Sequence, residues 1–303
     1  LIDRHTHLEG SLDPAWVRSE STRRGLALPA SLESLWSGAA VPFSGFIEAF
    51  LFGAALLDSR TAVREAALSV ARRTQRAGGA GFDLWASPHF LVVHRRQISL
   101  EDFWLGLEDG LSEARATGLR ACVVIDAVNH FGPKHGHEVL DLVLADLPSF
   151  VRGFSTGGLE GCPFRDWAPV FNRARTAGLR IAAHAGENGP GSNVREAVLE
   201  GGVERIVHGL RADAATLDLL ADRGIPVDVC PSSNGALAAD VTPHPLPHML
   251  RAGLRCALGT DDPGVIPCDL ASEARTARAM GLDEAALSTL RRHGAEDAWC
   301  LQP

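Results

Sequence analysis

Residues 164–187, with the sequence FRDWAPVFNRARTAGLRIAAHAGE, contain a complete structural unit that decides the fold. The stretch Phe164–Ala177 has the apolar spacing of a helix, and Gly178 follows it as a helix stop. The next residues, Leu179–Ala185, form a short apolar run that is typical of a buried strand. Two polar side chains, His184 and Glu187, stand at the end of that run. The stretch therefore predicts a helix, a tight turn and a strand that carries polar groups at its carboxyl end.

The same unit recurs along the whole chain. Short apolar or β-branched runs predict eight strands, Leu1–His7, Gly81–Ser87, Arg120–Asp126, Phe150–Thr156, Leu179–Ala185, Glu204–Gly209, Ile225–Cys230 and Arg255–Thr260. Helical periodicity fills the stretches between them, most clearly Thr61–Ala77, Leu100–Thr117, Phe164–Ala177, Ser192–Glu200 and Ala214–Arg223. Eight β-then-α units without a linker or a break in composition predict an α/β fold, a TIM-type (β/α)8 barrel, as one domain over residues 1–303.

The residues after the first strand distinguish this barrel from a dinucleotide-binding sheet. Such a sheet needs a glycine-rich phosphate loop at that point, where this chain has Leu8-Glu9-Gly10-Ser11. The segment Leu12–Leu57 is too long for one strand-to-helix connection. We therefore expect it to form extra helices above the first strand.

Composition limits the possible partners of the protein. The chain has 303 residues and a net charge of -8, and its basic residues form no cluster. This charge argues against nucleic acid as a partner and suits a small neutral or cationic substrate. No apolar run is long enough to cross a bilayer, so no membrane partner is expected. The six cysteines are scattered without a C-x-x-C pair, which is typical of reduced thiols in a cytoplasmic protein.

Histidines and carboxylates stand at the ends of the predicted strands, where barrels of this type carry their chemistry. They are His5 and His7 after strand one, His184 and Glu187 after strand five, His208 after strand six, and Asp261 and Asp262 after strand eight. In strand one the i, i+2 spacing aims two imidazoles to the same face. We assign a zinc ion, one per chain, to His5, His7, His184 and Asp261, because three histidines and a carboxylate leave a position for water.

The other strand-end groups fit a hydrolytic reaction at this metal. Zinc lowers the pKa of its water from ~16 to about 7. His208 is then free to orient or deprotonate that water, and Glu187 is close enough to donate a proton to a leaving group or a ring nitrogen. Glu187 could instead form a salt bridge at the start of the next helix. Asp262 could hydrogen-bond a ligand or cap a helix after Pro263.

These residues belong to motifs that resemble the adenosine deaminase family of the amidohydrolase superfamily. The resemblance runs in order over nearly the whole chain, through HTHLEGSL (5–12), FSTGGLE (154–160), HAGE (184–187), RIVHG (205–209), CPSSN (230–234) and TDDP (260–263). It implies the same zinc ligands, His5, His7, His184 and Asp261. It also implies that Glu187 protonates purine N1, and that His208 positions the attacking water at C6 before ammonia leaves.

The resemblance also assigns the substrate contacts. It implies that Asp262 hydrogen-bonds purine N7, that the Gly158 backbone N–H donates to N3, and that Glu9 contacts the sugar. Apolar side chains at i, i+3, i+4 and i+7 resemble the helix that forms a lid over the pocket, namely Phe43, Phe46, Ile47 and Phe50. Simple packing of that helix on the barrel is the alternative interpretation.

Some positions depart from the usual family pattern. They are Asp83, Trp85, Ser155, Leu159 and Val207, and none of them is expected to touch the metal ligands. Glu9 and the Gly157-Gly158 pair look more like subgroups that act on adenine or on modified adenosines such as aminodeoxyfutalosine. The resemblance therefore implies a small purine substrate. We expect a 6-aminopurine nucleoside, adenosine or a modified adenosine, with adenine or aminodeoxyfutalosine as the alternatives.

The remaining histidines are expected outside the metal site. His130, His135 and His137 are predicted to lie in a surface loop after strand three, with His130 at the mouth of the pocket. His89 and His94 are placed in the loop after strand two, and His244 is expected to fix the end of a loop between two prolines.

Two other functions stay open at this point. One is hydrolysis of a different bond at a two-metal site, which would need a carboxylated lysine or a bridging glutamate. The other is a non-catalytic relative that binds a nucleoside. The sequence also leaves the oligomeric state open, a homodimer included.

Overall fold

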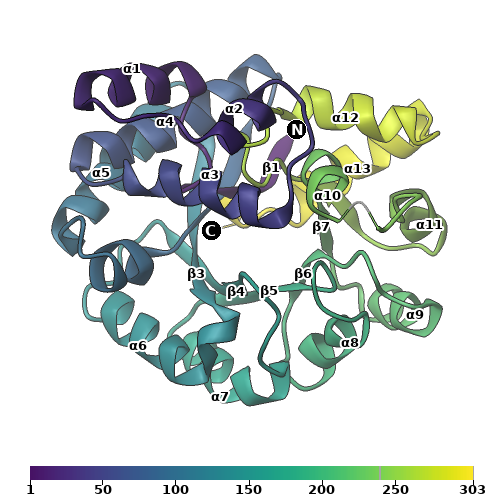
Figure 1. The fold of residues 1–303 in the computed structure, drawn as a ribbon. Helices are drawn as coiled ribbons and strands as arrows, with labels where there is room; N and C mark the ends of the chain where they lie inside the picture. Colours follow the sequence, from purple (N-terminus) through teal and green to yellow (C-terminus); the bar gives the residue numbers. More distant parts are fainter. Residues whose placement is uncertain (239, 303) are drawn as a thin grey trace.

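Eight parallel strands pair in chain order, β1 to β8, in the computed structural model, which describes residues 1–238 and 240–302 (Figure 1). The strands are β1 (Ile2–His7), β2 (Gly81–Ala86), β3 (Arg120–Val128), β4 (Val151–Gly157), β5 (Arg180–Ala185), β6 (Arg205–His208), β7 (Val227–Val229) and β8 (Cys256–Leu258). Each predicted strand is confirmed, with its ends shifted by a few residues, and the TIM-type (β/α)8 barrel is confirmed with it.

The barrel is closed between β8 and β1 by residues of the predicted metal site. The amides of Thr260 and Asp261 both donate to the carbonyl of His5, at 2.9 Å each. The amide of His7 in turn donates to the carbonyl of Asp261 at 2.7 Å, and Thr6 and Asp261 form a parallel bridge. Backbone hydrogen bonds alone therefore bring two strand-one histidines beside the strand-eight carboxylate, although 254 or more residues separate them in sequence.

Helices cover the outside of the barrel and agree with the predicted periodicity. They are α4 (Arg60–Arg76), α5 (Leu100–Ala116), α6 (Gly132–Leu144), α7 (Phe164–Thr176), α8 (Ser192–Leu199), α9 (Ala214–Arg223), α10 (Pro231–Leu237), α11 (Leu246–Arg251), α12 (Leu270–Ala279) and α13 (Glu284–Glu296). Side-chain oxygens of Ser59, Ser99 and Asp213 accept from the first turns of α4, α5 and α9, which fixes where these helices begin. Gly178 has a φ of 88°, as its predicted role as a helix stop requires.

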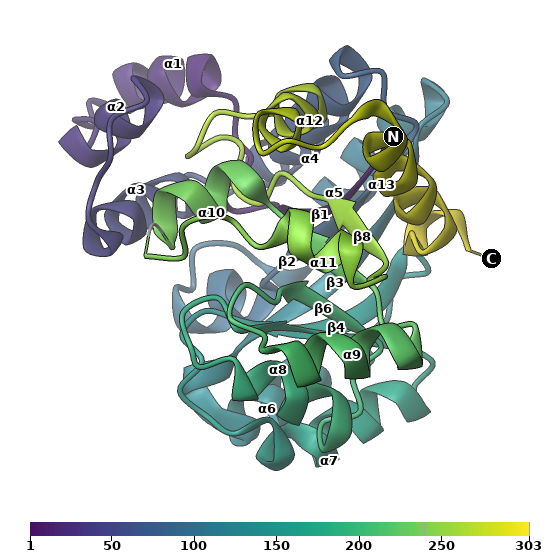
Figure 2. The same cartoon turned by 90° about the vertical axis from the view of Figure 1, so that its right-hand side faces the viewer.

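Three more helices fill the long first connection, as predicted from its length. They are α1 (Pro14–Arg24), α2 (Ala30–Trp36) and α3 (Phe43–Ala55). Figure 2 shows all three at the end of the barrel that lies away from both chain termini. Because the termini lie near the amino ends of the strands, α1–α3 lie at the carboxyl ends, above the site.

The opposite end of the barrel holds a buried group of charges. Arg205 Nη1 lies 2.9 Å from Asp83 Oδ2, and Arg4 Nη2 lies 2.6 Å from Asp228 Oδ1, with all four side chains fully buried. The C-terminal turn η3 (Trp299–Leu301) donates two backbone N–H groups to Asp83, at 3.0 and 2.8 Å. Asp83 therefore fastens the C-terminus to the barrel and does not line the substrate pocket.

Two further expectations concern the cysteines and membrane spans. All six cysteines are free thiols, and Cys122, Cys230 and Cys256 are buried as expected, although Cys230 follows β7 and is not part of it. Over the part of the chain that the structure describes, no helix is both long enough and apolar enough to span a bilayer.

Candidate active site

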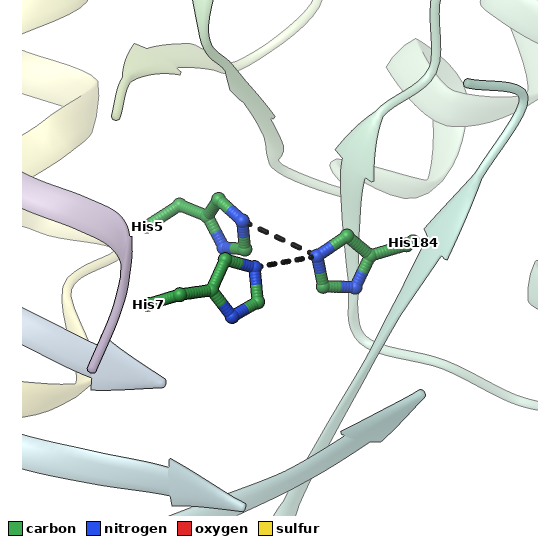
Figure 3. Close-up of side chains that lie close together, drawn as sticks. All are labelled: His5, His7 and His184. Carbon is green, nitrogen blue, oxygen red and sulfur yellow. Dashed lines mark hydrogen bonds between the residues drawn. The ribbon is translucent and has the colours of Figure 1, made fainter. Parts of the chain in front are cut away.

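Four side chains meet at the carboxyl ends of β1, β5 and β8. His7 Nε2 and His5 Nε2 each lie 3.2 Å from His184 Nε2. Figure 3 shows the two strand-one imidazoles turned toward the imidazole of His184, which comes from the far side of the barrel. Asp261 Oδ1 completes the group, at 3.1 Å from His5 Nε2 and 3.4 Å from His7 Nε2. The predicted metal ligands are therefore brought together.

The spacing and protonation of these four groups suit a divalent metal ion. A tetrahedral ion with bonds of 2.0–2.1 Å holds its ligand atoms about 3.3–3.4 Å apart, close to the separations found here. Burial lowers the pKa of His5 and of His7 to about 3, and it also lowers the pKa of His184. Neutral imidazoles are the form that binds metal. Three ring nitrogens that face each other beside a carboxylate are a donor set that a cation would satisfy.

Neighbouring groups orient the ligands. The backbone carbonyl of Thr156 lies 2.8 Å from His184 Nδ1 and accepts its proton, which leaves Nε2 free to bind metal. The hydroxyl of Ser233 donates to Asp261 Oδ2 at 2.5 Å, so only Oδ1 faces the histidines. Ser233 belongs to a motif seen in the sequence, but no role was predicted for it.

One expectation about the ligands is wrong. Trp85 on β2 was expected to stay clear of the metal ligands, yet its ring packs edge-to-face on His5 with 4.4 Å between centroids. Its indole N–H donates to the carbonyl of Arg4 at 3.1 Å. The alternation of side chains along β2 places Trp85 inside the barrel directly beside β1, where it pairs with His7, and this register could not be predicted from the sequence.

Glu187 and His208 stand together beside the metal ligands, as predicted. Glu187 Oε1 lies 3.6 Å from His208 Nε2. The side-chain amide of Asn234 donates to His208 Nδ1 at 3.0 Å, so the neutral ring carries its proton on Nε2. Burial raises the pKa of Glu187 above the usual range for a glutamate. The alternative of a structural salt bridge at the start of the next helix is not seen for Glu187, because α8 begins only at Ser192 and no described lysine or arginine pairs with this carboxyl group.

The backbone is strained at two of the site residues. His208 and Asp261 have φ values of 68° and 63°, in the left-handed region that residues with a side chain rarely adopt. Such conformations cost about 1–3 kcal/mol each and persist where the surrounding structure enforces them. At Asp261 the enforcing contacts are the hydrogen bonds that close the barrel. Strain at these two positions is therefore part of how the side chains are aimed.

Glu160 is a positioning residue that sequence reasoning missed. Its carboxylate accepts hydrogen bonds from four consecutive backbone N–H groups of the loop after β5, those of Gly186, Glu187, Asn188 and Gly189, at 2.9, 2.8, 3.1 and 3.0 Å. This loop carries the side chain of Glu187. The motif FSTGGLE contains Glu160, but only a contact between the loops after β4 and β5 explains its presence.

A cavity of about 400 Å³ opens above the metal ligands. The predicted substrate-binding residues Glu9, Phe46, Phe50, Gly158 and Asp262 all line it, together with Glu187 and His208. The apolar side chains of α3 form its roof, so the helical spacing seen in the sequence belongs to a pocket wall and not only to packing on the barrel. All predicted site residues therefore meet in one place.

Asp262 turns its carboxyl group into this cavity. Its Oδ1 is buried without a hydrogen-bond partner, and α12, the next helix, is capped by Asp269. Helix capping by Asp262 is thus wrong, and the ligand-binding alternative agrees with the geometry. A Cβ on Gly10 would lie 1.8 Å from Asp262 Oδ1, so glycine is required there to leave room for the carboxyl group.

Asp126 is a second acid of the cavity that sequence reasoning left unassigned. It lies near the end of β3, lines the cavity and is only 6% exposed. Burial, and then the negative charge of Glu9, raise its pKa well above the usual range for aspartate. The sequence places it at the end of a predicted strand, which is the same signal that marked the metal ligands.

The other histidines lie partly as expected. His130 lines the cavity and His244 fixes a loop, since its Nδ1 accepts from the amide of Leu246 at 3.1 Å. His135 and His137 are not in a surface loop, because they lie on α6, and His135 is buried against the ring of His89. Donor atoms of His89, His135 and Glu138 approach within 4.8 Å of one another, a looser group than the four ligands above.

Fold and site together define a class of protein, a barrel hydrolase with a cluster of candidate metal ligands at the carboxyl ends of its strands. The family model described as adenosine deaminase matches residues 1–303. The chain therefore belongs to the adenosine deaminase family, and it is a hydrolase of the deaminase type.

Similar proteins carry more than one substrate name. The chain is 31% identical to the adenine deaminase of Chelativorans sp. (strain BNC1), over 97% of this chain and 92% of that protein. It is 30% identical to the aminodeoxyfutalosine deaminase of Acidothermus cellulolyticus (98% and 92%) and 31% identical to the adenosine deaminase of Edwardsiella ictaluri (99% and 93%). The crystal structure of adenine deaminase from Arthrobacter aurescens superposes with a TM-score of 0.88 at 26% identity, covering 98% of this chain and 92% of that one.

Proposed function

We propose that the protein is a zinc-dependent deaminase that hydrolyses the C6–N bond of a 6-aminopurine nucleoside, adenosine or a modified adenosine. One observation carries the proposal. Four ligand atoms converge at 3.1–3.4 Å, directly beside an acid and an imidazole, at the base of a cavity with apolar walls. Addition of one water molecule to C6 and loss of ammonia would leave a carbonyl group at C6.

Zinc fits the donor set of three imidazoles and one carboxylate. His5, His7, His184 and Asp261 would hold the ion, and the open side of the group faces the cavity. When bound, zinc would lower the pKa of a coordinated water from ~16 to about 7 and so supply a nucleophile near neutral pH.

The chain's own acid and imidazole would perform the proton transfers. Burial raises the pKa of Glu187, which shifts it toward the acid form, and in this proposal Glu187 donates its proton to purine N1. Protonation at N1 draws electron density from C6 and opens that carbon to attack. His208, held by Asn234, presents a ring nitrogen toward Glu187 and would fix the direction of the attacking water.

Groups around the cavity would orient the purine ring. The free carboxyl oxygen of Asp262 would hydrogen-bond N7, and the N–H of Gly158 would donate to N3. Phe46 and Phe50 of α3 offer apolar contact to the ring or the sugar from above. These roles are proposals that rest on the positions of the residues around one cavity.

The identity of the purine is the finer part of the proposal. Relatives named for adenine, adenosine and aminodeoxyfutalosine are 30–31% identical to the chain, so identity does not separate them. We take the nucleoside as the expected substrate, and free adenine or aminodeoxyfutalosine as the alternatives.

The rival reaction at a two-metal site is poorly supported. Such a site needs a carboxylated lysine or a glutamate between the metals. Lys134 is the single lysine of the chain, and it lies on α6 with its side chain 92% exposed. It cannot reach the four ligands.

A substrate panel on metal-replete protein tests the proposal. Adenosine, aminodeoxyfutalosine and adenine are each incubated with the protein while ammonia release is followed, with and without a chelator. We expect release from at least one of them, its loss on chelation, its recovery with zinc, and one zinc ion per active chain. Ammonia release that continues in protein with no bound metal would contradict the proposal, and two metals per chain would favour the rival reaction.

A further inference from the structure

We infer that Asp126, beside the expected sugar contact Glu9, completes a carboxyl-lined subsite that binds a hydrogen-bond donor of the substrate and excludes phosphorylated substrates. The donor is a ring N–H of a free base or a hydroxyl group of a sugar. The inference rests on the proposed function and names the class of substrate that this cavity accepts. We call the pair Asp126 and Glu9 the carboxyl subsite.

Asp126 has an oxygen that no protein group uses. Oδ1 is buried and has no hydrogen-bond partner in the structure. It lies 4.0 Å from His184 Nδ1, beyond hydrogen-bond distance, and that nitrogen already bonds to the carbonyl of Thr156 at 2.8 Å. Asp126 is therefore not needed to orient His184, and a substrate group that reached its buried oxygen from the adjoining cavity would supply the missing hydrogen bond.

Glu9 also has a buried carboxyl oxygen without a hydrogen-bond partner among the described residues. Its Oε1 accepts from the backbone N–H of Ser87 at 2.8 Å, while Oε2 is buried without a partner. The side chain is held by that bond and lines the same cavity as Asp126. A buried polar atom without a partner costs about 1–3 kcal/mol, so two such atoms in one cavity indicate a ligand that supplies the missing hydrogen bonds.

Gly157 on β4 keeps the subsite open. A Cβ at that position would lie 2.3 Å from Asp126 Oδ2 and 3.3 Å from the ring of His184. Any side chain there would push the carboxyl group out of its place. The carboxyl group of Asp126 on β3 can therefore keep its position only because β4 has a glycine beside it.

The carboxyl subsite lies across the barrel from the reacting groups. Glu9 follows β1 and Asp126 lies on β3, whereas Glu187 follows β5 and His208 ends β6. In a closed barrel with strands in the order β1 to β8, the pair Glu9 and Asp126 therefore lies on the opposite wall from the pair Glu187 and His208. A purine with N1 at Glu187 would present its far edge, with N9 or the sugar, to the subsite.

The acidic lining of the cavity limits which groups the far edge of the substrate can carry. Among the described residues that line the cavity there is no lysine or arginine, whereas Glu9, Asp126, Glu187, Asp261 and Asp262 all contribute carboxyl groups. A phosphate group would meet these acids without a cation to balance it. A ring N–H or a sugar hydroxyl would instead donate to their free oxygens.

The test compares wild type with Asp126→Ala and Asp126→Asn on zinc-replete enzyme. The substrates form matched pairs, adenine with 9-methyladenine and adenosine with 2′,3′-dideoxyadenosine, and AMP is the charged probe. The exposed Asp146→Asn serves as the control. Zinc content and thermal unfolding are measured for every variant, so that a fold defect is separated from a binding defect.

We expect Asp126→Ala to raise KM about 10- to 100-fold for whichever donor-bearing substrate the wild type prefers, because the hydrogen bond between the substrate and the Asp126 carboxyl group is lost. kcat should change less than KM, since the contact lies away from C6. The rise in KM caused by Asp126→Ala should be smaller for the analogue of each pair that lacks the donor, 9-methyladenine or 2′,3′-dideoxyadenosine. The pair that shows this difference identifies the donor as the ring N–H or a sugar hydroxyl. Asp126→Asn should recover part of the affinity through its amide oxygen.

Two results would overturn the inference and leave the proposed function intact. They are unchanged KM values in Asp126→Ala, and deamination of AMP by the wild type at the efficiency found for the nucleoside or base. If zinc-replete wild type released no ammonia from any aminopurine, the proposed function itself would fail. These outcomes are distinguishable because the first two require an active wild-type enzyme.

Discussion

Glu187 shows how a single residue acquires its chemistry from its surroundings. Its carboxyl group lies beside His208 at the base of the cavity, and burial raises its pKa above the usual range for a glutamate. Glu187→Gln keeps the size and the hydrogen-bonding shape but removes the transferable proton. We expect kcat to fall about 10²- to 10⁴-fold, the usual contribution of general acid catalysis, with zinc still bound at one per chain.

Measurement of kcat and of zinc content on the same preparation checks this expectation. Glu200→Gln, an exposed change at the end of α8, is the control and should leave both unchanged. Turnover near the wild-type rate in zinc-loaded Glu187→Gln would remove the proton-donor role from this residue.

Glu160 makes a second prediction at this scale. Because its carboxylate holds four backbone N–H groups of the loop after β5, a neutral amide that donates as well as accepts would disturb the loop. We expect Glu160→Gln to lower kcat about 10- to 100-fold through misplacement of Glu187. Zinc content should stay near one, because His184 lies before the loop.

The pH profile of kcat and the melting temperature together distinguish a positioning role of Glu160 from a structural one. The pH profile of kcat should shift for Glu160→Gln, because Glu187 would meet a different environment, while the melting temperature changes little. A fall in melting temperature that accounts for all of the lost activity would argue for a purely structural role.

The sequence predicts the residues that carry chemistry better than those that hold them. His5, His7, His184 and Asp261 stand at strand ends, and strand ends converge in a barrel, so their meeting follows from the fold. Ser233 and Asn234 act from α10, and Glu160 acts from the loop after β4, through contacts with residues far away in sequence, which no spacing along the chain encodes. Asp126 stands at a strand end too, but one aspartate without a motif is no more than a candidate.

At the scale of secondary structure, α6 shows where local patterns mislead. Gly132, Pro133 and Gly136 suggested a loop, yet they form the first turns of a helix. Proline is tolerated in a first turn. A Cβ on Gly136 would lie 2.4 Å from the ring of Trp167, so this glycine allows α6 to pack closely on α7. Tertiary packing decided the structure here, and the sequence could not show it.

The position of His135 on α6 gives a prediction about pH. Burial lowers its pKa to about 4, so between pH 4 and 6.5 the folded protein binds fewer protons at this site than the unfolded chain does. The stability that the neutral ring contributes is therefore present above pH 6.5 and is lost as the pH falls toward 4. We expect His135→Asn to flatten this part of the stability curve.

Urea unfolding at several pH values between 4 and 7 measures the effect. His137→Asn, on the same helix, is the matched control and should keep the wild-type slope. Identical slopes for wild type and His135→Asn would show that the buried ring does not couple to pH.

At the scale of the whole molecule, stability and chemistry lie at opposite ends of the barrel. Asp83 binds Arg205 and two backbone N–H groups of the C-terminal turn, far from the cavity. Asp83→Asn leaves the buried guanidinium of Arg205 without its nearest charge. We expect a loss of about 3–5 kcal/mol in the free energy of unfolding.

Urea titration at constant metal concentration tests this expectation. Asp58→Asn, which removes the partner of Arg24 in an ion pair with part of its surface exposed, should cost under about 1 kcal/mol. Activity per zinc-loaded molecule should stay within about two-fold of wild type for both variants. A larger effect on kcat in Asp83→Asn than on stability would show that the two ends of the barrel are coupled.

The order of the eight strands could be predicted, because strands that follow each other in sequence and are joined by one helix usually pair side by side. The ionic group at the base could not, since Arg4, Asp83, Arg205 and Asp228 are far apart in sequence and match no motif. The only indication of this ionic group in the sequence was that charged residues lie inside predicted strands.

The seam between the first and last strands has a consequence for biosynthesis. Three residues of the candidate metal site, His5, His7 and His184, lie on β1 and β5, and Asp261 follows β8, so the carboxylate is the last of the four to be synthesised. Until Asp261 is in place, a nascent chain offers the three histidines alone. The complete donor set therefore forms only on ring closure, and a translation product truncated before β8 would lack the carboxylate.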